Sequence, residues 1–265
     1  MKSLTLDAQK TIKGKFKPSQ AAERDFYRQL KKVARASGHI VERHIPTISH
    51  PYDLRRMQDE LDKYAEALTP WAQRQSAKML EQVQKSNKRA YVNKSKAIGV
   101  ALKVGVAEQE VGAAALALMN EQVALIKSIP IEAGLRAQKI AYEAVLAGTR
   151  AEANTDTIAQ LEKELGLSTE VATSRALLIA RTEVARSNAA INQSRAMAVG
   201  SGQYRWHNSG DGNVREAHLY WRGREKLQGK IFSWDDPPTL QDGTKGHPGT
   251  FPNCRCFAEP VFNEE

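Results

Sequence analysis

The chemistry-bearing residues gather near the C-terminal end of the chain, where its two cysteines, Cys254 and Cys256, stand one residue apart. Two thiolates this close can ligate one soft metal ion, with His218 and either His247 or His207 completing four ligands. A structural zinc ion of this kind would staple a small core. The alternative is a pair of buried, reduced thiols that behave as small apolar groups. The pair lacks the Cys-x2-Cys spacing usual in zinc sites, so the sequence leaves both interpretations open.

A second set of residues could do acid–base chemistry. Arg181 and Glu183 lie two residues apart, so on a helix they do not face each other. Arg181 is expected to face Asp211 or another carboxylate of the C-terminal segment. Glu183 is expected to hold Arg215 or His218. These pairs would make a polar clasp that fastens a helix to the segment following it, whereas a second interpretation makes Glu183, Asp211 and His218 a hydrolytic or metal site.

Positive charge is concentrated at the start of the chain. The 265 residues carry 39 Lys and Arg against 30 Asp and Glu, a net charge of +9. Residues 1–50 hold 11 basic and 4 acidic side chains, which accounts for +7 of that total. Such an arm is expected to be a solvated leader, the alternative being a segment that contacts nucleic acid or an acidic protein face. Its candidate contact residues are Lys10, Lys13, Lys15, Lys17, Lys31 and Lys32.

The elements that must position these residues are mostly helical from residue 19 to about residue 200. The first helix is expected to open at Ser19 and to end at Gly38. A second opens at Pro51, and a third follows Thr69-Pro70. The second helix carries an apolar seam with steps of three and four residues, which is suited to packing against another helix. The seam consists of Leu54, Met57, Leu61, Tyr64 and Leu68.

Later helices are expected over residues 107–128, stopped by Pro130, and over 131–146. A short helix ending at Gly166 is followed by a long helix from Ser168 to about residue 199. After residue 200 the composition changes, because three of the four tryptophans and many glycines and prolines lie there. Short strands are expected at 202–207 and 230–234, with one or two helical turns within 214–220.

The predicted fold class is therefore mainly α, with an elongated multi-helix body and a small C-terminal α+β module. The expected divisions are a basic, flexible arm over 1–18, a helical body over 19–167, and a long helix with the module over 168–265. Two cysteines exclude a disulfide-rich secreted scaffold. No apolar run approaches the roughly 20 residues of a membrane span. With no secretion signal visible at the start, synthesis in a reducing cytoplasm is expected.

The stretch from Arg181 to Pro260 resembles the phage Mu protein F-like family of minor head, or head morphogenesis, proteins. The resemblance covers the last third of the chain and lies in the order and spacing of several short pieces. These are Ala180-Arg181-Thr182-Glu183 with Asn188, then Trp206, Asp211, Arg215 and His218, and the closing Pro252-Asn253-Cys254-Arg255-Cys256.

The resemblance implies a structural virion component without catalytic residues, made in the host cytoplasm and located in the head interior near the portal. The implied partners are the portal protein, with scaffold or major capsid protein and double-stranded DNA as further candidates. The basic arm would suit a DNA-filled interior or an acidic portal face. The alternative is a metal-dependent nuclease or hydrolase that uses Glu183, Asp211, His218 and the Cys254/Cys256 pair. The sequence has no glycine-rich phosphate loop, Gly-x-Ser-x-Gly elbow or His-Glu-x-x-His helix, so nothing in it requires catalysis.

Overall fold

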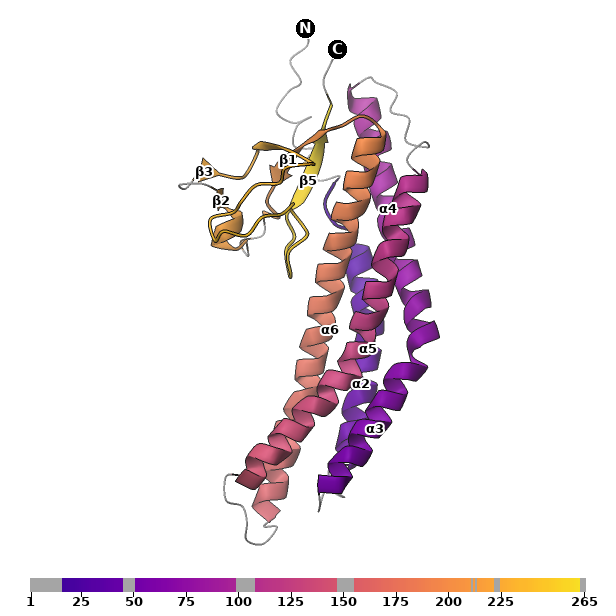
Figure 1. Cartoon of the computed structure of the whole chain (residues 1–265), viewed down its shortest axis with the longest axis vertical. Helices are drawn as coiled ribbons and strands as arrows, with labels where there is room; N and C mark the ends of the chain where they lie inside the picture. The colour runs from indigo at the N-terminus through magenta and orange to yellow at the C-terminus, as the bar shows by residue number, and fades with distance from the viewer. Residues whose placement is uncertain are drawn as a thin grey trace. The chain divides into compact units, whose positions relative to one another are not determined.

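The computed structural model describes residues 16–44, 51–98, 108–146, 155–210, 212, 214–221 and 225–262. Within these ranges the chain forms five α-helices followed by short strands, which confirms the prediction of a mainly α chain with a small C-terminal strand module (Figure 1). The helices are α2 (Gln20–His44), α3 (Pro51–Ala67), α4 (Thr69–Ile98), α5 (Glu108–Leu146) and α6 (Thr155–Ala198). None of the described helices combines the length and the apolar character that crossing a membrane requires.

Three predicted helix ends are wrong, and buried apolar faces explain all three. Helix α2 continues through Gly38 to His44 because its apolar face extends to the fully buried Val41. Helix α5 contains Pro130 in its interior. A proline inside a helix costs about 3 kcal/mol, but the face that it interrupts is buried on both sides of it. The buried residues of that face are Ile126, Ile129, Ala133 and Ala137.

The third error concerns α6, which runs without a break through Gly166 and Ser168. A glycine in a helix interior costs only about 1 kcal/mol relative to alanine. Later turns of α6 bury Ala172, Ala176 and Ile179. This burial outweighs the local preference for a break, so the two predicted helices form one.

The chain divides into two compact units, each assembled from separate stretches of sequence. The first unit comprises Met1–Glu23, Ala77–Met119 and Arg181–Glu265, and the second comprises Arg24–Ser76 and Asn120–Ala180. In the second unit the predicted seam of α3 is confirmed: Met57 and Leu61 are fully buried and pack with Val41 and Ala137. The first unit holds the strands and most of the candidate site residues.

The strands of the first unit make a three-stranded antiparallel sheet, β4-β1-β5, beside the C-terminal turns of α6 (Figure 1). Strands β1 (Gln203–His207) and β4 (Ile231–Ser233) confirm two predictions, whereas β5 (Phe257–Val261) was not anticipated. A second small sheet pairs β2 (Tyr220–Trp221) with β3 (Glu225–Lys226). The predicted helical turn is the 3-10 turn η3 (Glu216–His218), which ends on one of the candidate ligands.

The core of this unit is aromatic. Tyr204 and Trp206 alternate along β1 and are fully buried. Phe16, which the sequence analysis placed in the basic arm, is also buried, and its ring meets Tyr91 of α4 edge-on with centroids 5.3 Å apart. Residue 16 is therefore part of the folded core.

Candidate functional site

One face of the last turns of α6 is polar and yet buried. Asn188, Asn192 and Arg195 follow one another at steps of four and three residues, and Arg181 precedes Asn188 by seven, so all four share a face of the helix. The first three are at most 4% exposed. Buried polar groups need hydrogen-bond partners, and the C-terminal module and its neighbours supply them.

Asn192 stands at the centre of this network. Its Nδ2 donates to the Ala258 carbonyl oxygen of β5 at 2.9 Å. Its Oδ1 accepts from the Tyr91 hydroxyl at 3.0 Å and from Asn87 Nδ2 at 3.2 Å, both on α4. Burial raises the pKa of Tyr91 well above its usual value, so the hydroxyl remains a donor. A single side chain thus joins α6 to a strand and to another helix.

Arg195 and Asn188 extend the network in both directions. The fully buried Arg195 donates to Asn87 Oδ1 and, at 3.4 Å, to Glu108 Oε1. Asn188 Nδ2 donates to the Phe16 carbonyl oxygen at 3.1 Å, which holds the start of the described chain against α6. The predicted clasp did not include Asn192 or Arg195. Their spacing from Asn188 was the signal that could have found them.

Arg181 has polar partners other than the predicted carboxylate of the C-terminal segment. Its Nε donates to Glu23 Oε1 at 3.2 Å and its Nη1 to Asn253 Oδ1 at 2.9 Å. Asp211, the expected partner, lies outside the described residues. Glu183 is 1% exposed and accepts from Arg186 of its own helix at 3.1 Å.

The loop before the cysteines is held from two sides. Asn253 has φ 57°, a left-handed conformation that asparagine tolerates better than most residues. Its backbone N–H donates to Thr182 Oγ1 at 2.9 Å, so the turn is fixed to α6. Arg215 donates to the Pro252 carbonyl oxygen at 2.7 Å from the other side. The two contacts place Cys254, the next residue, at a defined position.

His218, Cys254 and Cys256 come together as one buried cluster. Their ligand atoms all lie within 4.8 Å of one another, and Cys254 Sγ is 3.4 Å from His218 Nδ1. The three residues are 2–4% exposed, and neither cysteine is in a disulfide bond. A hydrogen bond from Cys256 and the neighbouring His218 outweigh burial and lower the pKa of the Cys254 thiol well below its usual range.

Neither of the other candidate histidines belongs to this cluster. His247 Nδ1 lies 3.1 Å from the Tyr204 hydroxyl, and the ring packs against Tyr204 and Trp234. Burial lowers the pKa of His247, which favours the neutral ring. His207 lies on β1 and uses both ring nitrogens in other contacts. The structure therefore groups three of the four predicted ligands and places His247 elsewhere.

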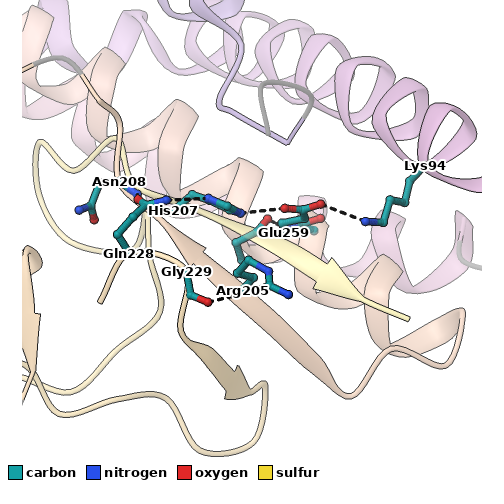
Figure 2. Close-up of polar contacts among 9 residues, drawn as sticks. Lys94, Arg205, His207, Asn208, Gln228, Gly229 and Glu259 are labelled. Atoms are coloured by element: carbon teal, nitrogen blue, oxygen red, sulfur yellow. Dashed lines mark hydrogen bonds and ion pairs between the residues drawn. The ribbon is translucent and has the colours of Figure 1, made fainter. Parts of the chain in front are cut away.

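His207 takes part in a line of polar contacts that the sequence analysis missed. Lys94 Nζ of α4 donates to Glu259 Oε1 at 3.0 Å, and Glu259 Oε2 lies 2.7 Å from His207 Nε2 (Figure 2). Gln228 Nε2 lies 3.1 Å from His207 Nδ1, and Gln228 Oε1 accepts from the Asn208 backbone N–H at 2.7 Å. Glu259 on β5 is thus tied both to β1 and to α4.

The backbone contact fixes the tautomer of His207. A backbone N–H can only donate, so the Asn208 N–H must meet the oxygen of the Gln228 side chain. The NH2 group of Gln228 then points toward His207. His207 Nδ1 must then accept, and the ring proton lies on Nε2, pointing at Glu259. Burial raises the pKa of Glu259, but the hydrogen bond from His207 and the charge of Lys94 outweigh it and lower this pKa to about 2.

The remaining candidates are scattered. Trp206 is fully buried and its indole N–H donates to Asn208 Oδ1 at 3.0 Å. Lys17 Nζ donates to the Ser209 carbonyl oxygen at 3.0 Å and lies 5.8 Å from the centre of the Phe257 ring. Lys31 lies over Tyr27 and Lys32 is exposed, both on α2. Lys10, Lys13 and Lys15 are outside the described residues.

Comparison with known proteins agrees with the resemblance seen in the sequence. The profile of the family described as Phage Mu protein F like protein matches residues 137–259. An uncharacterized protein of Haemophilus influenzae is 37% identical over 147 residues, which are 56% of this chain. The chain spans only 29% of that relative's length, and no solved structure gives a significant match. The predicted family is thus confirmed, and residues 137–259 are a phage Mu protein F-like region.

Proposed function

We propose that this chain is a phage head morphogenesis protein, a structural component of the virion head that binds the portal protein. The observation that carries the proposal is the family match over residues 137–259. That segment contains the polar face of α6, the predicted clasp residues and the buried cluster of His218, Cys254 and Cys256. In this proposal the protein acts in the head interior near the portal vertex, with scaffold, major capsid protein and double-stranded DNA as further partners.

The chemistry of the clasp supports a structural role. Arg181, Asn188 and Asn192 are engaged with backbone carbonyls and with other side chains of the same unit. Catalytic groups need access to a substrate, whereas His218 and the two thiols are 2–4% exposed. The arrangement favours a rigid module that binds a partner through its surface rather than a module that converts a substrate.

A partner surface is available on the second unit. Leu135 and Tyr142 of α5 lie one heptad apart and are 55% and 63% exposed. With Leu54 and Gln58 of α3 they line a groove of about 540 Å³, whose remaining lining residues are charged or polar. Exposed apolar side chains that line a groove are typical of protein-binding sites, and we assign this groove to the portal contact.

Co-expression with the portal protein of the same phage, followed by affinity purification of the portal, tests the proposal. The chain is expected to co-purify, and Leu135→Asp to reduce its recovery at least tenfold. Leu116→Asp is the matched control, because Leu116 is also on α5, is 63% exposed and belongs to the other unit. Failure of the unaltered chain to co-purify would overturn portal binding. Equal loss with both variants would remove the groove from the proposal.

A further inference from the structure

The cluster of His218, Cys254 and Cys256 has the dimensions of a metal site. In a tetrahedral zinc centre with Zn–S near 2.3 Å and Zn–N near 2.05 Å, a sulfur and a nitrogen ligand are about 3.6 Å apart. Cys254 Sγ and His218 Nδ1 are 3.4 Å apart. All three ligand atoms lie within 4.8 Å of one another, so a single ion can contact them with small side-chain adjustments.

The donor set selects the kind of ion. Two thiol sulfurs and one imidazole nitrogen favour a soft or borderline cation such as Zn²⁺, whereas Mg²⁺ and Ca²⁺ require oxygen ligands. The fourth position falls to water or to Asn208, whose Oδ1 is 3.9 Å from Cys256 Sγ. The rings of Trp206 and Phe251 pack against His218, with centroids 6.4 and 4.9 Å away. An apolar surround of this kind shields metal–sulfur bonds from solvent.

The ligands come from two places that the sheets alone do not join firmly. His218 ends the short turn η3, and the cysteines lie in the loop before β5. Of the strands between them, β2 and β3 have two residues each and β4 has three. A bound ion would close the 36-residue separation between His218 and Cys254 with direct bonds. Modules with a small core gain most from such a cross-link.

We propose that His218, Cys254 and Cys256 bind one Zn²⁺ ion, which fixes the cysteine loop to the turn η3. This site does not depend on the head morphogenesis role, because it rests on the ligand geometry. The chain could bind the ion without acting in head morphogenesis, and it could act in head morphogenesis without binding the ion. His247 is excluded from the ligand set by its contacts with Tyr204 and Trp234.

Elemental analysis of the full chain tests the site. The protein is purified under reducing conditions without chelators, incubated with Zn²⁺ and freed of excess metal by buffer exchange. About one equivalent of zinc is expected. His218→Ala and the double variant C254S/C256S are expected to retain less than a fifth of that amount. His247→Ala and His207→Ala, the same change at other histidines of the same unit, should retain it fully.

A second measurement covers the case in which the ligand variants do not fold. Co²⁺ is added to the folded, unaltered chain, and the thiolate-to-cobalt charge-transfer absorption is recorded. Its appearance, and its loss when Zn²⁺ displaces Co²⁺, supports the site. A folded, reduced chain that takes up less than about a tenth of an equivalent of either metal overturns it, and so does zinc that stays bound in the C254S/C256S variant. An intact mass two hydrogens lower in the protein as isolated from the cytoplasm would instead assign the pair to a disulfide.

Discussion

The two units bury different kinds of helix face. In the second unit, α3 presents Met57 and Leu61 to apolar neighbours, and the contact depends on volume. In the first unit, α6 presents Asn188, Asn192 and Arg195, and each contact depends on a specific partner atom. An apolar seam accepts any side chain of similar size, whereas a buried amide accepts only a geometry that satisfies its donors and acceptors. Substitutions on the buried helix face should therefore be tolerated less well in the first unit than in the second.

The largest difference is expected from size-conserving substitutions. Asn192→Leu removes the hydrogen-bond partner of Asn87 Nδ2 and of the Ala258 carbonyl, and leaves the Tyr91 hydroxyl only its contact with the Asn192 backbone carbonyl; it should lower the free energy of unfolding by about 3–4 kcal/mol. Leu61→Met in the apolar seam should cost less than about 1.5 kcal/mol. Urea denaturation of both variants measures the two costs. Equal costs would show that the polar face behaves as an ordinary core.

A smaller effect is expected at Gly249, in the loop that leads to Cys254 and Cys256, where this loop meets α6 at Ala185. Its φ is 91°, and a Cβ would lie 3.2 Å from the Cys256 carbonyl oxygen and 3.3 Å from that of Ala185. Gly249→Ala should cost about 2–3 kcal/mol, from backbone strain and from the close contacts together. Gly243→Ala is the control, because Gly243 has φ 82° with no atom within 4 Å of the added carbon. It should cost about 1 kcal/mol, the strain alone, and thermal denaturation at one pH compares the two.

The ion pair of Glu259 with Lys94 and its hydrogen bond from His207 should make stability depend on acid pH. Because its pKa is near 2 in the folded chain and 4.5 in the reference state, the carboxylate contributes fully above pH 4.5. That contribution, on the order of 2 kcal/mol, is lost as the pH falls from 4.5 toward 2. Glu259→Gln should remove this part of the pH dependence. Glu225→Gln, which alters an exposed ion pair with Lys230, should leave it unchanged in denaturation curves at several pH values.

The smallest effect on folding is expected from the N-terminal lysines. If the arm contacts DNA, exchanging Lys10, Lys13 and Lys15 for glutamine should reduce the slope of log affinity against log salt by about one per lysine. The same exchange at Lys78, Lys85 and Lys88 of α4 is the charge-matched control. Fluorescence anisotropy with a DNA duplex at several salt concentrations measures the slope. Truncation should stop before residue 16, because Phe16 is part of the core. Identical slopes in the two variants would exclude a specific role for the arm.

Local patterns predicted the elements that depend on local physics. The seam at Met57 and Leu61 and the strand at Tyr204 and Trp206 follow from periodicity, and the structure has both. The helix ends at Gly38 and Pro130 were wrong because tertiary burial outweighed a local preference. Strand β5 escaped notice because Phe257-Ala258-Glu259-Pro260-Val261 lacks alternation and contains a proline.

The sequence pointed to Arg181 and His218 as polar candidates but not to the residues that they contact. Glu23 and Asn253, the partners of Arg181, lie 158 and 72 residues away from it in the sequence. Residue spacing along the sequence does not predict contacts over such separations. The absence of both His207 and His247 from the cluster likewise needed three-dimensional information, because both lie at plausible distances in sequence from the cysteines.

The pairing of β5 with β1 and its ties to α4 have a consequence for biosynthesis. Asn87 and Tyr91 leave the ribosome more than 160 residues before Ala258, which completes their network through Asn192. Until Asn192 follows, 105 and 101 residues later, these side chains have only water to satisfy them, and the Asn192 amide itself then waits for Ala258. Contacts of such separation form slowly. The first unit must therefore close after most of the chain has been translated, whereas the seam between Met57 and Ala137 can begin to pack earlier.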